Sequence, residues 1–351
     1  MKDHLPFNPA VHLTIQKTLM TSLLFEGFWD RWIAHGMEKE TVAGLRRKVK
    51  GVEDWVEYLA ERARSYESQA EAAQDELHAE HAFRMAGLHY NLAQWIYPEA
   101  GVQKKHWFSS CTEAFDNADR KAEDTIRKVV FRLDDKLCIG RIRKPERPRG
   151  CVVILTPMDS SKEELFSYET DFARLGFAAV SFDGPGQGET YLQSQLKMSR
   201  QTGERFVNRV IEFAAAEFPG LGIYLFGTSS GAAWAIWGSR HPKVSKAVSV
   251  SPALESDVPM PDYFTERLSY LLEEPYKRPL PDMRDVGQSS PVFLFHGNRD
   301  VMVKDEQLHA LYDKLPQGKR LVEYEDEGHC CNFKLHEIRQ LSAHWFLEDE
   351  K

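Results

Sequence analysis

The feature that most constrains this chain is a series of short apolar runs, beginning near residue 126, that alternate with amphipathic stretches. The later runs are apolar almost throughout, as strands are when helices cover both faces of a parallel sheet. Strands are expected at 126–133, 136–142, 151–156, 177–182, 223–227, 246–251, 291–297 and 321–325. Helices are expected near 162–174, 203–218, 230–241, 305–315 and 334–348. The pattern predicts an α/β fold, with a mostly parallel, twisted sheet flanked by helices.

The first two runs have a different pattern from the others. Polar residues alternate with apolar ones in both, and only Asp134 and Asp135 separate them from each other. Such a pair predicts an antiparallel hairpin at one edge of the sheet.

Residues 9–123 follow helical spacing, because apolar and aromatic residues recur at intervals of three and four and nowhere alternate. The clearest helices are expected at 54–73 and 79–97, the second ending at Pro98, among about five in all. We therefore expect two domains in the 351 residues. Residues 1–124 would form an all-helical cap or dimerisation domain, and 125–351 a catalytic domain with cap or pocket segments at 189–222 and 253–290.

Composition excludes several classes of function. The net charge of -8 offers no basic face for nucleic acid. The first ten residues lack an apolar signal core, and no run approaches membrane-spanning length, so a soluble, cytoplasmic protein without membrane contact is expected. The five cysteines form neither a CxxC pair nor a disulfide framework, which predicts reduced thiols, with Cys330 and Cys331 as small packing residues.

The sequence Gly227-Thr-Ser-Ser-Gly231 lies between an expected strand and an expected helix. Flanking glycines allow the abrupt turn that exposes a serine hydroxyl at the carboxyl end of a sheet. In this context Ser229 is predicted to be a nucleophile, and the Ser230 amide is predicted to donate to an oxyanion. The same pentapeptide without the strand and helix is common by chance.

A nucleophilic serine needs a base and an acid that orients the base, here in the order Ser, Asp, His. Asp300 follows the expected strand 291–297, and His329 lies on the loop before the last expected helix. Either residue alone reads as an ordinary loop residue. Three residues of the right types, in the right order at strand ends, predict a catalytic triad.

The loop after the expected strand 151–156 should supply the second oxyanion donor through a main-chain amide. We favour Met158, with Asp159 next. The same loop is also expected to cap a helix that starts near Ser161.

Two other motifs could be read as a dinucleotide cofactor site and a metal site, and neither is predicted to be one. In residues 183–190 the glycines follow a GxGxG spacing interrupted by Pro185, and a cap segment rather than a helix is expected next, so a dinucleotide site is not predicted. His78 and His81 lie one turn apart without a third ligand, which is typical of a helix surface.

The combined motifs resemble one branch of the α/β-hydrolase superfamily, in which a helical domain precedes the sheet. That branch includes 2,6-dihydroxypseudooxynicotine hydrolase, the fungal pigment-precursor polyketide-shortening hydrolases and the fermentation-respiration switch esterases. The resembling segments are 159–164 (DSSKEE), 183–188 (DGPGQG), the elbow at Ser229, 296–300 (HGNRD) and 328–332 (GHCCN).

The resemblance implies the α/β-hydrolase fold, a homodimer, and a small-molecule substrate held between two domains. It implies hydrolysis of a carbon-carbon bond next to a ketone or, alternatively, of an ester, and an assisting pocket acid for which Asp257 and Asp262 are the candidates. Trp29, Trp32 and Tyr90 would suit an aromatic substrate, although packing between helices explains most residues of this kind. Acyl transfer or elimination, and a non-catalytic partner-binding protein that retains the fold, remain alternatives.

Overall fold

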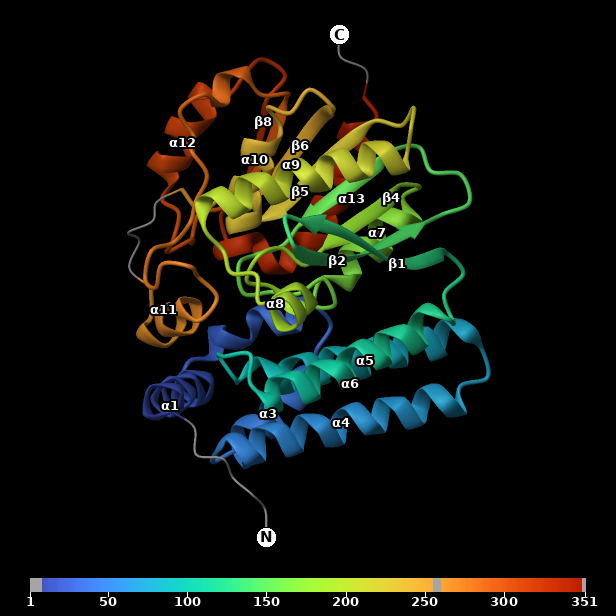
Figure 1. Ribbon diagram of the computed structural model, residues 1–351, viewed down its shortest axis with the longest axis vertical. Coiled ribbons are helices and arrows are strands. Elements are labelled where there is room, and N and C mark those ends of the chain that lie inside the picture. The colour runs from blue at the N-terminus through green and yellow to red at the C-terminus, as the bar shows by residue number, and fades with distance from the viewer. Residues whose placement is uncertain (1–7, 255–259, 349–351) are drawn as a thin grey trace. The chain divides into compact units, whose positions relative to one another are not determined.

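The computed structural model describes residues 8–254 and 260–348, which form two compact units. The helical unit consists of residues 8–122 together with 260–271, and the α/β unit consists of residues 123–254 and 272–348. Segment 260–271 thus packs with the helical unit, although in sequence it lies between two stretches of the α/β unit. Both units are drawn in Figure 1.

The α/β unit is built on one eight-stranded sheet in the order β1-β2-β4-β3-β5-β6-β7-β8. Every expected strand is present: β1 (Thr125–Leu133), β2 (Lys136–Lys144), β3 (Cys151–Leu155), β4 (Ala178–Phe182), β5 (Ile223–Thr228), β6 (Val244–Val250), β7 (Val292–Gly297) and β8 (Arg320–Tyr324). All neighbours from β4 to β8 run parallel. The predicted α/β-hydrolase architecture is confirmed.

The predicted edge hairpin is also confirmed. β1 pairs with β2 in antiparallel register, Val129 opposite Gly140, across the turn at Asp134 and Asp135. Asp134 has a φ of 56°, a left-handed conformation that suits a tight turn. β2 then joins the rest of the sheet by antiparallel pairing with β4.

Helices cover both faces of the sheet, which explains why β3, β4, β5 and β7 are buried along their whole length. One face carries α7 (Phe166–Arg174) and α13 (Leu335–Phe346). The other carries α9 (Arg200–Glu217), α10 (Ser230–Gly238) and α12 (Asp305–Lys314) (Figure 1). On that second face, Ile236 of α10 packs with Leu308 and Leu311 of α12 in one buried cluster.

The helical unit contains α1 (Pro9–Leu24), η1 (Glu26–Trp29), α2 (Asp30–Ala34), α3 (Lys39–Lys48), α4 (Val52–Ala72), α5 (Glu76–Trp95), α6 (Val102–Asp119) and α11 (Asp262–Ser269). α5 packs against both α4 and α6. Trp55 of α4 donates a hydrogen bond to the Leu92 carbonyl at 3.1 Å, and Arg267 of α11 lies 3.6 Å from the centre of the Trp95 ring. In the described ranges, none of the helices combines the length and hydropathy that crossing a membrane requires.

Two expectations about helix starts were wrong. α7 begins at Phe166 rather than near Ser161, because residues 161–165 form turns closed by bonds such as Glu164 N–H to the Ser161 carbonyl. α8 (Gly188–Ser194) follows the glycine-rich segment directly, where a cap segment was expected. The Asp183 carboxylate accepts from the Glu189 N–H at the start of α8, where a dinucleotide phosphate would need to lie.

Candidate active site

Ser229 sits at a sharp turn between β5 and α10 and has a φ of 54° and a ψ of -120°. The turn depends on the flanking glycines. A Cβ on Gly227 would lie 2.2 Å from the Gly231 carbonyl oxygen, and one on Gly231 would lie 2.0 Å from that of Leu155. This strained conformation places the hydroxyl beyond the carboxyl end of β5, as the sequence predicted.

Asp300 and His329 follow the carboxyl ends of β7 and β8. Main-chain bonds join these two loops, because the Asn298 N–H donates to the Tyr324 carbonyl and the Arg299 N–H to that of Glu327, each at 3.0 Å. The parallel strands therefore bring both side chains to the sheet edge where Ser229 lies.

The imidazole of His329 bridges the other two side chains. Its Nδ1 lies 2.8 Å from Oδ2 of Asp300, and its Nε2 lies 2.9 Å from Oγ of Ser229. With the proton on Nδ1, His329 donates to the carboxylate and accepts from the serine hydroxyl. The structure thus brings together all three residues that the sequence named.

The Asp300 carboxylate is held in a fixed orientation. Its side chain has no exposed surface, and Oδ1 accepts from the N–H groups of Met302 at 2.8 Å and Val303 at 3.1 Å. Burial alone would raise the pKa of Asp300, but the hydrogen bonds from His329 and the two amides lower it overall. Asp300 is therefore ionised at neutral pH.

Burial lowers the pKa of His329, whereas the neighbouring Cys330 and Asp300 raise it, and the net pKa lies well above the ordinary value. The Asp300 carboxylate raises this pKa both through its hydrogen bond to Nδ1 and through its negative charge. Cys330 and Cys331 both have left-handed backbone conformations, with φ values of 69° and 47°. Cys331 is buried and Cys330 is partly exposed, and all five cysteines are free.

Two main-chain amides, those of Ser230 and Met158, are the candidate oxyanion donors. Ser230 is the first residue of α10, and in the described part of the chain neither its N–H nor that of Met158 has a hydrogen-bond acceptor. The close approach of Gly231 to the Leu155 carbonyl packs the elbow against the start of the Met158 loop. Asp159 lies on the same loop and is less buried than Met158.

The remaining candidate residues lie elsewhere. Trp29 and Trp32 are almost completely buried inside the helical unit, where Trp29 stacks on Trp55 with the ring centres 5.6 Å apart, and Tyr90 hydrogen-bonds to Glu67 at 3.0 Å. The side chain of Asp262 is 86% exposed at the start of α11, 3.8 Å from Lys17. Asp257 lies outside the described residues. Contact of any of these with substrate stays a prediction.

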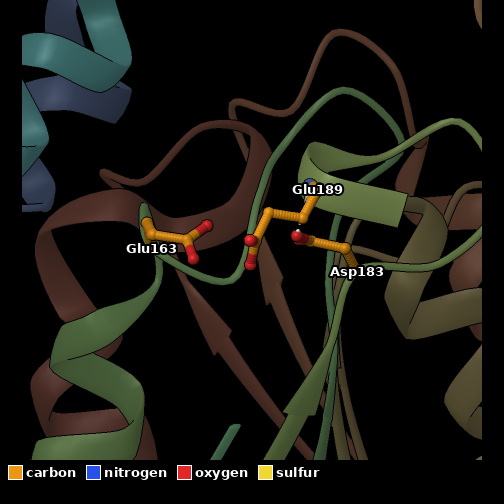
Figure 2. A group of neighbouring side chains, drawn as sticks. All are labelled: Glu163, Asp183 and Glu189. Atoms are coloured by element: carbon orange, nitrogen blue, oxygen red, sulfur yellow. Dashed lines mark hydrogen bonds between the residues drawn. The ribbon is translucent and has the colours of Figure 1, made fainter. Parts of the chain in front are cut away.

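A buried cluster of charges, which the sequence analysis did not identify, lies beside the Met158 loop. The carboxylates of Glu163, Asp183 and Glu189 converge within 4.8 Å of one another (Figure 2). Such a group could hold a metal ion, but the Lys162 ammonium lies among them, 2.7 Å from Glu163 and Glu189 and 2.8 Å from Asp183. The position that a cation would occupy is therefore filled by the chain's own lysine.

The family described as serine aminopeptidase, S33 matches residues 146–289, which include Ser229. The chain is 27% identical to 2,6-dihydropseudooxynicotine hydrolase of Paenarthrobacter nicotinovorans over 189 residues, 52% of this chain and 50% of that protein. It is also 27% identical to the α/β hydrolase ucsC of Acremonium sp over 221 residues, 55% of this chain and 45% of that one. The matched region thus spans about half the length of these curated relatives.

Among solved structures, that of 2,6-dihydroxy-pseudo-oxynicotine hydrolase superposes with a TM-score of 0.75 at 22% identity. The superposition covers 91% of this chain and 94% of that one. Because the identity is low, the comparison shows that the two proteins share a fold. The superposition extends over the helical unit as well as the sheet. The chain therefore has the α/β-hydrolase fold, and over about half of its length its sequence is similar to hydrolases with that fold.

Proposed function

We propose that this chain is a serine hydrolase that cleaves a carbon-carbon bond adjacent to a ketone, through an acyl-enzyme on Ser229. The observation that carries the proposal is the continuous hydrogen-bonded path from Ser229 through His329 to Asp300, with separations of 2.9 and 2.8 Å. A hydroxyl in this arrangement loses its proton to the imidazole as it attacks a carbonyl.

In the first half of the reaction Ser229 Oγ bonds to the ketone carbon and its proton moves to His329 Nε2. The Ser230 and Met158 amides stabilise the oxyanion, and the buried Asp300 carboxylate stabilises the imidazolium. The carbon-carbon bond then breaks, and the leaving carbon departs as an enolate that takes the proton from His329. In the second half, water activated by the same imidazole attacks the acyl-enzyme and releases a carboxylic acid and free Ser229.

Carbon-carbon cleavage is supported by the motif resemblance described above and by the 27% identity to 2,6-dihydropseudooxynicotine hydrolase over 52% of this chain. Ester hydrolysis is the second candidate, because an alkoxide leaving group could take its proton from His329 in the same way as the enolate.

Labelling with a fluorophosphonate tests the nucleophile. Wild-type protein should label at Ser229, and Ser229→Ala should not. Equal labelling of the two proteins would exclude the triad and favour a non-catalytic role for the fold.

A substrate panel separates the chemistries. Aryl 1,3-diketones should be turned over with a higher kcat/KM than p-nitrophenyl esters of similar size, and the reverse ranking would assign an esterase. Turnover in ¹⁸O-labelled water should place one label in the acid product. Product without label would instead indicate acyl transfer or elimination.

The assembly and location of the protein are part of the same proposal. The branch that the chain resembles leads us to propose a homodimer, and the residues at the start of the sequence and the aromatic side chains lead us to propose a cytoplasmic enzyme acting on an aromatic ketone or ester. Light scattering coupled to size-exclusion chromatography should give twice the 40.4 kDa mass of one chain.

A further inference from the structure

We propose that Lys162 and Gln187 are positioning residues that clamp the loop carrying Met158 and so set the geometry of the oxyanion hole. The inference rests on the proposed function, because it assigns these residues a role in the same reaction. Among the described residues, neither side chain forms a hydrogen bond with Ser229 or His329. Any effect of Lys162 and Gln187 on catalysis would therefore act through the position of the loop.

The first attachment is at the far end of the loop. The Lys162 main-chain N–H donates to Asp183 Oδ1 and its ammonium to Asp183 Oδ2, both at 2.8 Å. The same ammonium donates to Glu189 at 2.7 Å. Asp183 follows β4 and Glu189 lies in the first turn of α8, so one lysine fixes the loop to the end of a strand and the start of a helix.

The second attachment is at the near end of the loop, through Gln187. Its amide nitrogen donates to the Pro157 carbonyl at 2.7 Å, and its amide oxygen accepts from the Thr156 hydroxyl and the Gly184 N–H, both at 2.8 Å. Pro157 and Lys162 are on either side of Met158 and Asp159. The segment that should carry the second oxyanion donor is therefore held at both ends by residues 183–189.

The clamp is buried and closely fitted. Lys162 and Asp183 have no exposed surface, and Gln187 is 8% exposed. A Cβ on Gly188, which has a φ of 38°, would lie 2.2 Å from Asp183 Oδ2, so only glycine leaves room for the carboxylate. A buried ammonium with three carboxylate partners is displaced only at great cost, which makes this loop rigid before substrate arrives.

The charges explain why a lysine is needed. Burial lowers the pKa of Lys162, but the surrounding carboxylates raise it well above its usual value, so it stays charged. Burial and its acidic neighbours raise the pKa of Glu163 to about 7, whereas the attraction of Lys162 overcomes burial and lowers the pKa of Glu189. Without the ammonium, like charges would push the loop away from Asp183.

Two variants remove the clamp, one at each end: Lys162→Met and Gln187→Leu. A matched control is Lys246→Met, because Lys246 is also a buried lysine of the α/β unit. Its ammonium binds the Trp345 and Glu348 carbonyls from the amino-terminal part of β6, at the opposite end of the sheet from Ser229. Circular dichroism and thermal melts identify which variants fold.

The measurements are kcat and KM on the best substrate of the panel, and inhibition by an aryl trifluoromethyl ketone and its methyl ketone analogue. The fluorinated ketone forms a tetrahedral oxyanion on the serine, and the methyl ketone binds mainly as the unreacted ketone. Misplacing an oxyanion donor typically costs about 10²-fold in kcat. Both clamp variants should lose about that factor in kcat and in affinity for the fluorinated ketone, with KM and methyl ketone affinity little changed.

Each outcome decides the inference. Clamp variants that fold and keep kcat within about threefold of wild type overturn it, and so does an equal loss of kcat in Lys246→Met. If Lys162→Met does not fold, Gln187→Leu alone decides. If Ser229→Ala still turns over substrate, both the proposed function and this inference are wrong. If Ser229→Ala is inactive but both clamp variants keep full activity, only this inference is wrong.

Discussion

Gly231 of α10 faces the main-chain carbonyl of Leu155 so closely that a Cβ would lie 2.0 Å from its oxygen. This contact joins the turn that carries Ser229 to the end of β3, where the Met158 loop begins. Close backbone packing therefore fixes the Ser229 turn against the first residues of the Met158 loop.

Gly231→Ala should consequently be damaging to both stability and activity. The neighbouring atoms belong to the main chain and cannot rotate away, so we expect a loss of about 3 kcal/mol or more in the free energy of unfolding. Urea denaturation measures it. Gly287→Ala is the control, since a Cβ there meets its nearest atom at an ordinary 3.4 Å, and it should change stability by less than about 1 kcal/mol.

Asp300→Asn should preserve the fold and remove most of the activity. The amide oxygen can still accept from Met302 and Val303, while its NH₂ would donate to His329 Nδ1 and place the imidazole proton on Nε2. That tautomer cannot accept from Ser229, and the equivalent change in other triads lowers kcat by about 10⁴-fold. Steady-state kinetics would contradict the assignment if kcat fell by less than about tenfold.

The pH dependence should follow His329. Since Asp300 raises the pKa of His329, the ring binds a proton at higher pH than it otherwise would, and protonated His329 cannot act as a base. The kcat/KM of the wild type should therefore rise with pH through the pKa of His329. NMR titration should show that pKa lowered in Asp300→Asn, where burial remains and the carboxylate charge is lost. An unchanged pKa would mean that Asp300 does not set it.

Cys330 should be the reactive thiol of the native protein. It is partly exposed, whereas Cys111, Cys138, Cys151 and Cys331 are buried, and burial raises the pKa of Cys138 to about 12. Ellman's reagent should modify one thiol per folded chain and inactivate the protein, because the adduct would crowd His329. Cys330→Ser should stay active after the same treatment, and rapid loss of two or more thiols would contradict the structure.

Chelators should leave the protein unaffected despite its three converging carboxylates. The Lys162 ammonium already occupies the space among Glu163, Asp183 and Glu189. Excess EDTA should change neither Tm nor kcat, and added Mg²⁺ or Ca²⁺ should not raise Tm. A rise in Tm with either ion would show that a cation competes with Lys162 for the carboxylates.

The sequence predicted what local patterns encode. A strand covered on both faces must be apolar along its length, so each strand from β3 to β7 could be read from its own residues. The elbow at Ser229 was readable because its glycines are required by the turn itself. Asp300 and His329 were found because parallel strands deliver their carboxyl ends to the same edge.

Only the tertiary structure shows which residues join the Met158 loop to residues 183–189. Lys162 lies 21 residues from Asp183 and 27 from Glu189 in sequence. No local sequence pattern predicts that a charged lysine will be buried against carboxylates that are so distant in sequence. Burial in the helical unit, likewise, placed Trp29 and Trp32 in its core rather than on a surface. Periodicity specifies which residues become buried, but the partner of a buried charge depends on which distant segments fold against it.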